Sequence, residues 1–413
     1  MKKIVLFCMT CGILFAGGYK IPEISLNSVA LSAANIAHVK SADAAYYNPA
    51  NMVFMENKNF FEAALTYIGL EDINYKGSYI STSGTTSGYD IDSKKEHFLI
   101  PSFNFVSKDM DGVRFGLCVV SPLGLSKRWD EAPAIYTAEE FTLKTVEVNP
   151  SIAFALSSNV SAAIGIRAIY SEGTVKSVSP IAYRDMSGDS LDLGYNLALS
   201  YRPVSKAELA LTYRSNIDLG INGDAVLFFR DMTNMFGNGV GTSYGSNSSA
   251  SVSVPSPASF SFAAAYTFDS ETTVELVYER NFWHSYSRLD FDYGATVDPA
   301  ANTIFGAAIR KDYKDTNVFR LGITQKLDKL TLMGGMVIDK TPLPSSTLGF
   351  ELPDSDSVSV SFGSRYQISD TLNIGLGALY SIREDREILN GSIDGKFTNM
   401  NVLLISTAIE YRF

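Results

Sequence analysis

The sequence predicts an all-β protein: a 14-stranded antiparallel transmembrane β-barrel with an N-terminal plug, or hatch, of short helices. Three observations predict this class. Apolar residues alternate with small or polar ones in many separate segments after residue 58. No run of eighteen or more apolar residues follows residue 18, so we expect nothing there to cross a membrane as a helix. The apolar residues, 46% of the 413, are instead spread evenly, which is typical of barrel strands that are only half apolar.

The first eighteen residues are typical of a secretory signal peptide. Lys2 and Lys3 form a short basic start, Ile4 to Phe15 form an apolar core, and Ala16-Gly17-Gly18 offers small residues for cleavage. An apolar core of about twelve residues is too short to span a bilayer as a helix. We therefore expect residues 1–18 to be removed on export. The alternatives are an uncleaved anchor or a buried N-terminal helix.

Charge and cysteine content fit an exported chain. The formal net charge is −10, and it falls to about −12 when Lys2 and Lys3 leave with the signal peptide. An acidic chain without basic blocks is not expected to bind nucleic acid. Only Cys118 follows the signal peptide, so no disulfide is possible within the mature chain.

Alternation is clearest at the C-terminus, where every second residue from Leu403 to Phe413 is apolar or aromatic except Thr407. A strand that ends on a terminal phenylalanine resembles the terminal signature of bacterial outer-membrane proteins, which the barrel-assembly machinery recognises. We therefore expect Phe413 to contact that machinery. The alternative is a sandwich strand that happens to end the chain.

The same period of two recurs along the chain, and its second face carries small or charged residues that we place in a polar lumen. Tight turns alternate with long polar loops, which is the asymmetry of an outer-membrane barrel. An even number of strands brings both ends of the chain to one side. The fourteen expected strands are 59–69, 96–107, 112–123, 142–156, 159–175, 189–203, 206–220, 250–268, 271–291, 315–327, 329–340, 356–367, 370–384 and 400–413.

Residues 19–58 lack this alternation. They are small and polar with modest apolar content, so we expect short helices and turns. Fourteen strands enclose a lumen wider than side chains alone can fill, and an empty lumen would be an open aqueous pore. The sequence therefore predicts a hatch at 19–58 inside a barrel formed by 59–413.

Four short segments carry a family resemblance. They are Tyr47-Asn48-Pro49-Ala50, Ser121-Pro122-Leu123-Gly124-Leu125, Thr145 to Pro150, and Asp339 to Pro344. Each is common alone, but their order and spacing along a barrel-patterned chain are specific. Over essentially the whole mature chain the sequence resembles the FadL family, the transporters of long-chain fatty acids and other hydrophobic compounds in Gram-negative outer membranes.

The resemblance implies passive uptake of fatty acids or other hydrophobic small molecules. Ligands are captured at extracellular loops, pass to a luminal pocket near the mature N-terminus, and leave sideways through a gap in the barrel wall. Tyr19 and Ile21 are the implied ligand contacts in the pocket. Asn48, Pro49 and Ala50 are the implied hatch and gating residues. The implied surroundings are outer-membrane lipid, including lipopolysaccharide, and we expect a monomer.

Pro122 and Gly124 support a kink in the third strand independently of the resemblance. Proline cannot donate to a ladder, and glycine tolerates backbone torsions that other residues avoid. Both lie at the end of an otherwise regular strand that begins near Arg114. We expect a lateral gate there. The alternative is that the strand simply ends.

An apolar pattern marks one long loop. Phe229, Met232 and Phe236 are spaced as one face of a helix, and Phe228 precedes them. An apolar helical face in an extracellular loop is costly to expose unless it binds something. We expect it to capture ligand, with Trp129 of an earlier loop in the opposing wall. The alternative is that the two loops only pack on each other.

One position departs from the family pattern. Glu172 stands where a family member has an arginine that reaches the ligand carboxylate. Either Arg167, Arg320 or Arg365 serves a carboxylate, or the ligand is neutral.

No enzyme constellation or cofactor motif stands out. The three histidines are scattered without metal-ligand spacing, and no nucleophile elbow or phosphate-binding glycine loop is present. We expect a protein that is not an enzyme and needs no cofactor or metal. A general diffusion porin and an outer-membrane lipolytic enzyme are the alternative functions.

Overall fold

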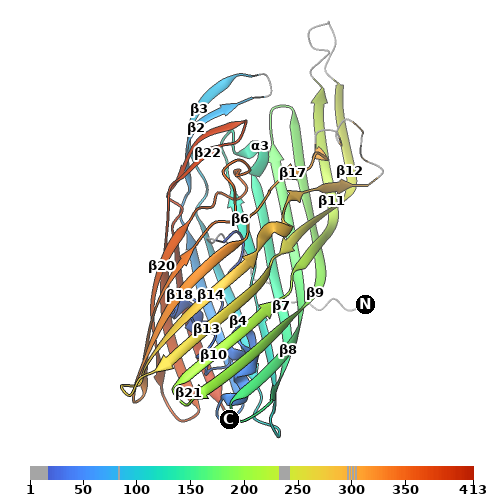
Figure 1. Cartoon of the computed structure of the whole chain (residues 1–413). Helices are drawn as coiled ribbons and strands as arrows, with labels where there is room; N and C mark the ends of the chain where they lie inside the picture. Colours follow the sequence, from blue (N-terminus) through green and yellow to red (C-terminus); the bar gives the residue numbers. More distant parts are fainter. Residues whose placement is uncertain are drawn as a thin grey trace.

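The structure, a computed structural model, describes residues 17–81, 84–231, 242–294, 297, 299, 302 and 305–413. Nearly all of the expected signal peptide lies outside the described residues. Described strands form a closed barrel with fourteen antiparallel wall strands, which confirms the predicted fold class (Figure 1). The ring closes where β1 (Phe60–Leu70) pairs with β24 (Val402–Arg412).

Eleven wall strands are continuous and three are split. The continuous strands after β1 are β4 (Glu96–Val106), β7 (Glu140–Ala155), β8 (Val160–Val178), β9 (Ala182–Val204), β14 (Thr272–Phe282), β18 (Thr316–Leu327), β19 (Leu330–Asp339), β20 (Ser357–Gln367), β21 (Leu372–Arg383) and β24. The split strands are β5 (Val113–Val120) with β6 (Gly124–Arg128), β10 (Ala207–Arg214) with β11 (Ile217–Asp231), and β12 (Thr242–Ser256) with β13 (Ala258–Thr267).

Four expected boundaries differ from the structure by seven residues or more. The strand expected at 271–291 ends at Phe282, where the 3-10 helix η2 (Trp283–Ser285) turns the chain inward with Trp283 fully buried. The strand expected at 206–220 runs on to Asp231, the one expected at 189–203 begins at Ala182, and the one expected at 250–268 begins at Thr242. These three extensions pair with one another or with β8, and the local pattern does not encode that pairing.

The two faces of each wall strand differ as the alternation predicts. In β24, Leu403, Ile405 and Ile409 are exposed on the outside of the ring, whereas Ser406 and Glu410 are buried inside it. Ser406 accepts a hydrogen bond of 2.9 Å from Thr66 of the adjacent strand. Outward apolar residues therefore face lipid and inward polar residues line the lumen.

Small sheets lie at the end of the barrel opposite the C-terminus, and β2, β3 and β22 are visible there in Figure 1. Because long loops face outward in outer-membrane barrels, this is the extracellular end. The elements are the four-stranded sheet β2 (Asn74–Ile80), β3 (Thr86–Asp92), β22 (Arg386–Leu389) and β23 (Ile393–Thr398), the pair β15 (Arg288–Leu289) and β17 (Ile309–Arg310), and β16 (Phe291–Tyr293), which pairs with β12. One short helix, α3 (Ile135–Ala138), lies there too.

No helix in the described part of the chain is both long enough and apolar enough to span a membrane.

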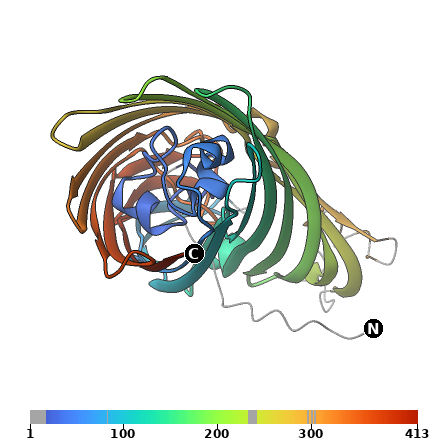
Figure 2. The same ribbon diagram turned by 90° about the horizontal axis from the view of Figure 1, so that it is seen from below.

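The described part of residues 19–58 lies within the ring of strands, as the view along the barrel shows (Figure 2). They form α1 (Leu26–Ala30), α2 (Ala44–Tyr47) and the 3-10 helix η1 (Pro49–Phe54). Ser25 caps α1 and forms a capping box with Ser28. We call residues 19–58 the hatch.

Wall glycines let the hatch approach the barrel closely. A Cβ on Gly335 would lie 2.2 Å from the backbone carbon of Leu31, and one on Gly363 would lie 2.5 Å from the Cβ of Ala30. Both distances are below van der Waals contact. The small inward residues of β19 and β20 thus make room for α1.

Glu275 of β14 holds the hatch by its backbone. Its carboxylate accepts hydrogen bonds from the N–H groups of Ile36, Ala37 and His38, at 2.7, 2.7 and 3.0 Å. An unsatisfied buried donor costs roughly 1–3 kcal/mol. Glu275 is therefore a main anchor between hatch and wall.

Glu275→Ala is expected to loosen the hatch and raise the steady ion current of the protein in a planar bilayer, because three buried N–H groups lose their acceptor. Glu275→Gln keeps a carbonyl acceptor, so its effect should be smaller. Glu384→Ala, in an exposed loop, is the matched control and should leave the current unchanged. If Glu275→Ala leaves the ion current at the wild-type level, these hydrogen bonds do not hold the hatch.

Candidate functional site

The third wall strand is interrupted, and the N-terminal segment bonds to the interruption. β5 ends at Val120 and β6 begins at Gly124. The N–H of Ile21 donates to the Pro122 carbonyl at 2.8 Å, and the N–H of Gly124 donates to the Tyr19 carbonyl at 3.0 Å. Lys20 and Leu123 form an antiparallel bridge between these bonds. The segment Tyr19–Ile21 is thus a short strand laid against the break.

The barrel ladder also stops beside this break. β4 pairs with β5 from Phe103 opposite Val119 to Val106 opposite Gly116. On the extracellular side of Phe103, the next backbone hydrogen bond is made by Lys94, which precedes β4. Its N–H donates to the carbonyl of Arg128 at the end of β6, at 2.9 Å. A window in the ladder therefore lies next to the residues that interrupt the third strand.

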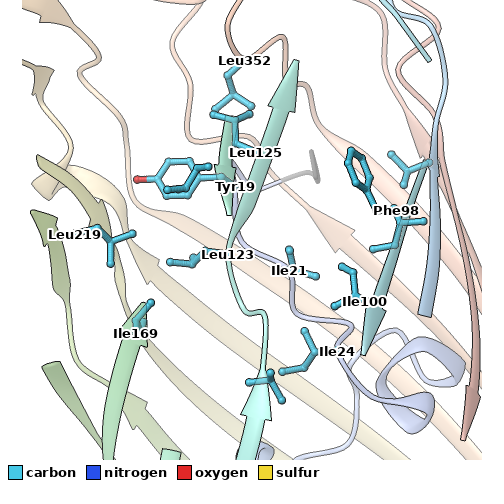
Figure 3. Packing of buried hydrophobic residues seen from close by; sticks show 14 of the residues in the cluster. Tyr19, Ile21, Ile24, Phe98, Ile100, Leu123, Leu125, Ile169, Leu219 and Leu352 are labelled. Carbon is cyan, nitrogen blue, oxygen red and sulfur yellow. The ribbon is translucent and has the colours of Figure 1, made fainter. Parts of the chain in front are cut away.

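Apolar side chains line the luminal side of this window. Phe98 and Ile100 of β4 are buried and belong to one hydrophobic cluster with Ile21, Ile24 and Leu123. Figure 3 shows Ile21 and Ile24 between the broken strand and these two residues of β4. The luminal side of the window is therefore hydrophobic.

A largely apolar cavity adjoins Tyr19 on the extracellular side. Its empty space, counted with the open solvent at its mouth, is about 740 Å³. It is concave and mostly apolar, as small-molecule sites usually are. The lining draws on strands β6 to β9, β11 and β12 and on the loops above the barrel, and includes Leu125, Phe141, Leu143, Val175, Met186 and Leu352.

Tyr19 contacts a group of aromatic rings at this cavity. Its ring packs edge-on against Trp283 at 4.9 Å between centroids, and its hydroxyl donates to the Pro255 carbonyl. Tyr286 and Tyr313, 4.8 Å apart, complete the group. Burial raises the pKa of Tyr19, Tyr286 and Tyr313, so these phenols stay neutral.

Gly18 explains why a small residue precedes Tyr19. Its φ is +76°, and a Cβ there would lie 2.9 Å from the Trp283 ring. Its N–H donates to Asp354 at 3.3 Å, and Asp354 in turn pairs with Arg383 at 2.7 Å. The start of the hatch is thereby held at one position beside the aromatic group.

A second cavity, of about 660 Å³, lies on the other side of the N-terminal segment. Its lining is more polar than that of the first cavity and includes Lys20, Tyr46, Arg167, Arg214 and Glu279. The cations are paired: Lys20 with Glu279 at 2.9 Å, and both arginines with Glu147. Residues 19–22 therefore separate an apolar cavity from a polar one.

The sequence-predicted residues fall into several places. Of the two implied pocket contacts, Tyr19 lines the apolar cavity, whereas Ile21 is buried against the broken strand and lines the polar one. Asn48, Pro49 and Ala50 lie deeper in the barrel. Asn48 donates to Ser200 at 2.8 Å, and the Ala50 carbonyl accepts from Ser161 at 2.8 Å. They bind the hatch to the wall rather than lining the apolar cavity.

Trp129 lies outside that lining. It packs edge-on against Phe350 at 5.3 Å and near Phe397, and its Nε1 donates to the Phe350 carbonyl at 2.9 Å. The structure therefore does not bring Trp129 together with Phe228 and Phe229.

The prediction of a helix at 226–236 is wrong for residues 226–231, which belong to a strand. Phe228 and Phe229 belong to β11, where they pair with Gly245 and Tyr244 of β12 and with β9 on the other side. Neighbouring residues of a strand point to opposite faces. Backbone pairing with β9 and β12 therefore holds this segment in a strand, although its apolar residues have helical spacing. Met232 and Phe236 lie outside the described residues.

The arginines proposed for a ligand carboxylate are all engaged. Arg167 pairs with Glu147 at 3.0 Å, Arg320 with Glu23 at 3.4 Å, and Arg365 with Glu62 at 2.5 Å. Glu172 lies in β8 opposite Lys144. None of these four residues, the three arginines and Glu172, lines the apolar cavity.

Several residues of the site were missed by sequence reasoning. Tyr286, Tyr313, Lys311 and Glu351 all line the apolar cavity. Three of them come from the connection between β14 and β18 and Glu351 from the connection between β19 and β20, with no shared spacing, so no sequence pattern marks them. Among the described residues, no group of three or more potential metal ligands is present.

A comparison with protein families matches residues 7–413 to the family described as "Outer membrane protein transport protein (OMPP1/FadL/TodX)". The long-chain fatty acid transport protein of Salmonella typhi is 22% identical over 345 residues, which cover 77% of this chain and 76% of that protein. The corresponding protein of Escherichia coli strain K12 is 21% identical over 358 residues, 77% of each chain.

Solved structures share the fold. A FadL homologue from Pseudomonas aeruginosa superposes with a TM-score of 0.83 at 18% identity, covering 96% of this chain and 99% of that one. The toluene transporter TodX of Pseudomonas putida superposes with a TM-score of 0.71 at 16% identity, covering 97% and 99%.

Proposed function

Because the chain belongs to the outer membrane protein transport protein family (OMPP1/FadL/TodX), we propose that it takes up hydrophobic small molecules passively and releases them sideways through the barrel wall. The protein is a β-barrel of the Gram-negative outer membrane. Its relatives are named for long-chain fatty acids or for toluene. The proposed ligands are accordingly fatty acids, aromatic hydrocarbons or similar compounds.

The observation that carries this proposal is the position of Tyr19–Ile21. On one side of this segment lies the apolar cavity, and on the other lie the broken strand and the window in the ladder beside Phe98 and Ile100. Two backbone hydrogen bonds join the segment to the break. A ligand that displaces the segment would connect the cavity with the window and reach the bilayer without crossing the polar lumen.

A diffusion porin is the weaker candidate. Porins conduct through an open aqueous lumen, whereas here the hatch occupies the ring and is bonded to the wall on several sides (Figure 2). The family consists of transport proteins, which argues for transport rather than lipolysis.

A reversible crosslink tests the proposed route. Lys20 and Leu123 face each other between two backbone bonds, the kind of antiparallel pair in which Cα atoms lie about 4.5 Å apart, within disulfide range. Lys20→Cys with Leu123→Cys, in a Cys118→Ser background, should reduce uptake of labelled fatty acid or toluene to the background of cells lacking the protein. Reductant should restore it, because only the motion of the segment is blocked.

Each single cysteine variant under the same oxidant is the control and should transport normally. If the fully oxidised double variant transports at the wild-type rate, the N-terminal segment does not gate the path.

A further inference from the structure

We propose that Glu351 makes the apolar cavity selective for uncharged molecules. Its carboxylate pairs with the buried cation Lys311, which would otherwise bind the carboxylate of a ligand. This inference rests on the proposed function and narrows its ligand class. Glu351 is a specificity-determining residue: without it the same cavity would accept carboxylates.

The charge of the lining supports this. Among the described residues that line the cavity, the acids and bases are Lys311, Glu351 and Asp224. The Lys311 side chain is 4% exposed, and its Nζ bonds to Oε1 of Glu351. The lining tyrosines are neutral, as argued above. The lining therefore carries a formal charge of −1, and its one cation already has a partner.

Both members of the pair are held in place. The N–H of Lys311 donates to the Ser287 carbonyl at 2.8 Å, and its carbonyl accepts from the Thr347 hydroxyl at 2.7 Å. The Glu351 carboxylate lies close to Gly349, where a Cβ would lie 2.1 Å from Oε2. The pair is a built feature of the loops rather than a chance surface contact.

Trp129 supports the position of Glu351. Its indole N–H donates to the carbonyl of Phe350, the residue before Glu351, and Phe350 is buried among Tyr75, Trp129 and Phe397. Trp129 is thus a positioning residue for the cavity wall.

Four arginines near the lumen do not offer an alternative site. Arg167, Arg320 and Arg365 each carry a carboxylate partner. Arg184 lies over the rings of Phe291 and Phe305, at 4.8 and 5.9 Å, and is not part of the cavity lining. A ligand carboxylate would have to displace Glu351 and lose its own hydration, which is unfavourable in an apolar cavity.

A matched pair of probes tests the inference: 1-octanol and octanoate, which share a chain length and differ in head-group charge. Calorimetric titration of the purified full-length protein at about pH 8 keeps the acid ionised. Wild type should bind octanol at least about tenfold more tightly than octanoate. In Glu351→Gln the affinity for octanoate should rise at least about tenfold, since Lys311 is then free for a charge-assisted bond, while the affinity for octanol changes little.

Two further variants keep the charge argument separate from folding. Lys311→Met combined with Glu351→Met removes both charges, so the gain in octanoate affinity expected for Glu351→Gln should be absent. Asp224→Asn removes a lining charge that is exposed, and should raise octanoate affinity less than Glu351→Gln.

Equal binding of both probes to wild type, or an unchanged octanoate affinity in a folded Glu351→Gln variant, would overturn the inference and leave the transport proposal standing. If wild type binds neither probe, the cavity is not a ligand site, and the proposed function fails with the inference.

Discussion

Replacing Pro122 and Gly124 with valine should reduce uptake to the background of cells lacking the protein, with the barrel still folded. Proline removes a ladder donor, and valine restores it and favours an extended backbone. The edge of β4 above Phe103 lies beside the break, so a repaired third strand can pair with it and close the window. The repair would also displace Tyr19 and Ile21 from their bonds to the break.

The measurement is uptake of a labelled hydrophobic compound by intact cells, with folding checked by heat-modifiable migration in gel electrophoresis. Pro203→Val is the matched control, because Pro203 is an exposed proline near the periplasmic end of β9. It should transport normally. Full uptake by the folded double variant would exclude lateral exit at this window.

Deleting residues 19–58 is expected to convert the protein into an open pore with a large steady current in a planar bilayer. Wall ladders such as the β1–β24 closure use no hatch residue, so the ring should still close. A barrel of this size has a lumen wider than its own side chains fill. The deletion also removes the partners of Glu275 and Arg320, so water and ions should take their place.

Residues 386–398 provide a control of another kind. They form β22 and β23 of the sheet at the extracellular end, outside the ring, so their deletion should leave the current low. If the hatch deletion conducts no more than wild type, the hatch is not what blocks the lumen.

The barrel could be predicted because each strand carries its own signal. The outward Leu403 and Ile405 and the inward Ser406 and Glu410 differ in exposure as the alternation predicts. The interruption beside Pro122 could also be expected, since a missing N–H is a local property. By contrast, the helix expected at 226–236 fails at Phe228 and Phe229, because pairing on both sides of β11 outweighs a spacing that local sequence leaves ambiguous.

Only part of the candidate site could be predicted from the sequence. The family resemblance implies Tyr19 as a ligand contact, and the sequence predicts Trp129 in a loop wall opposite the 226–236 segment. In the structure Trp129 is buried against Phe350 and acts on the cavity through that neighbour. A loop residue's role depends on which other loop it meets.

The sequence by itself determined that this protein is a barrel, which face of each strand meets lipid, and where the third strand breaks, because two-residue periodicity and the lack of a proline N–H act within a few residues. Only the tertiary structure decided that Tyr19 lies beside Trp283 and Tyr286, and that Lys311 meets Glu351. The physical reason is that closing the ring brings the N-terminal segment and several distant loops to one end of one lumen. No local pattern encodes which of their side chains then touch.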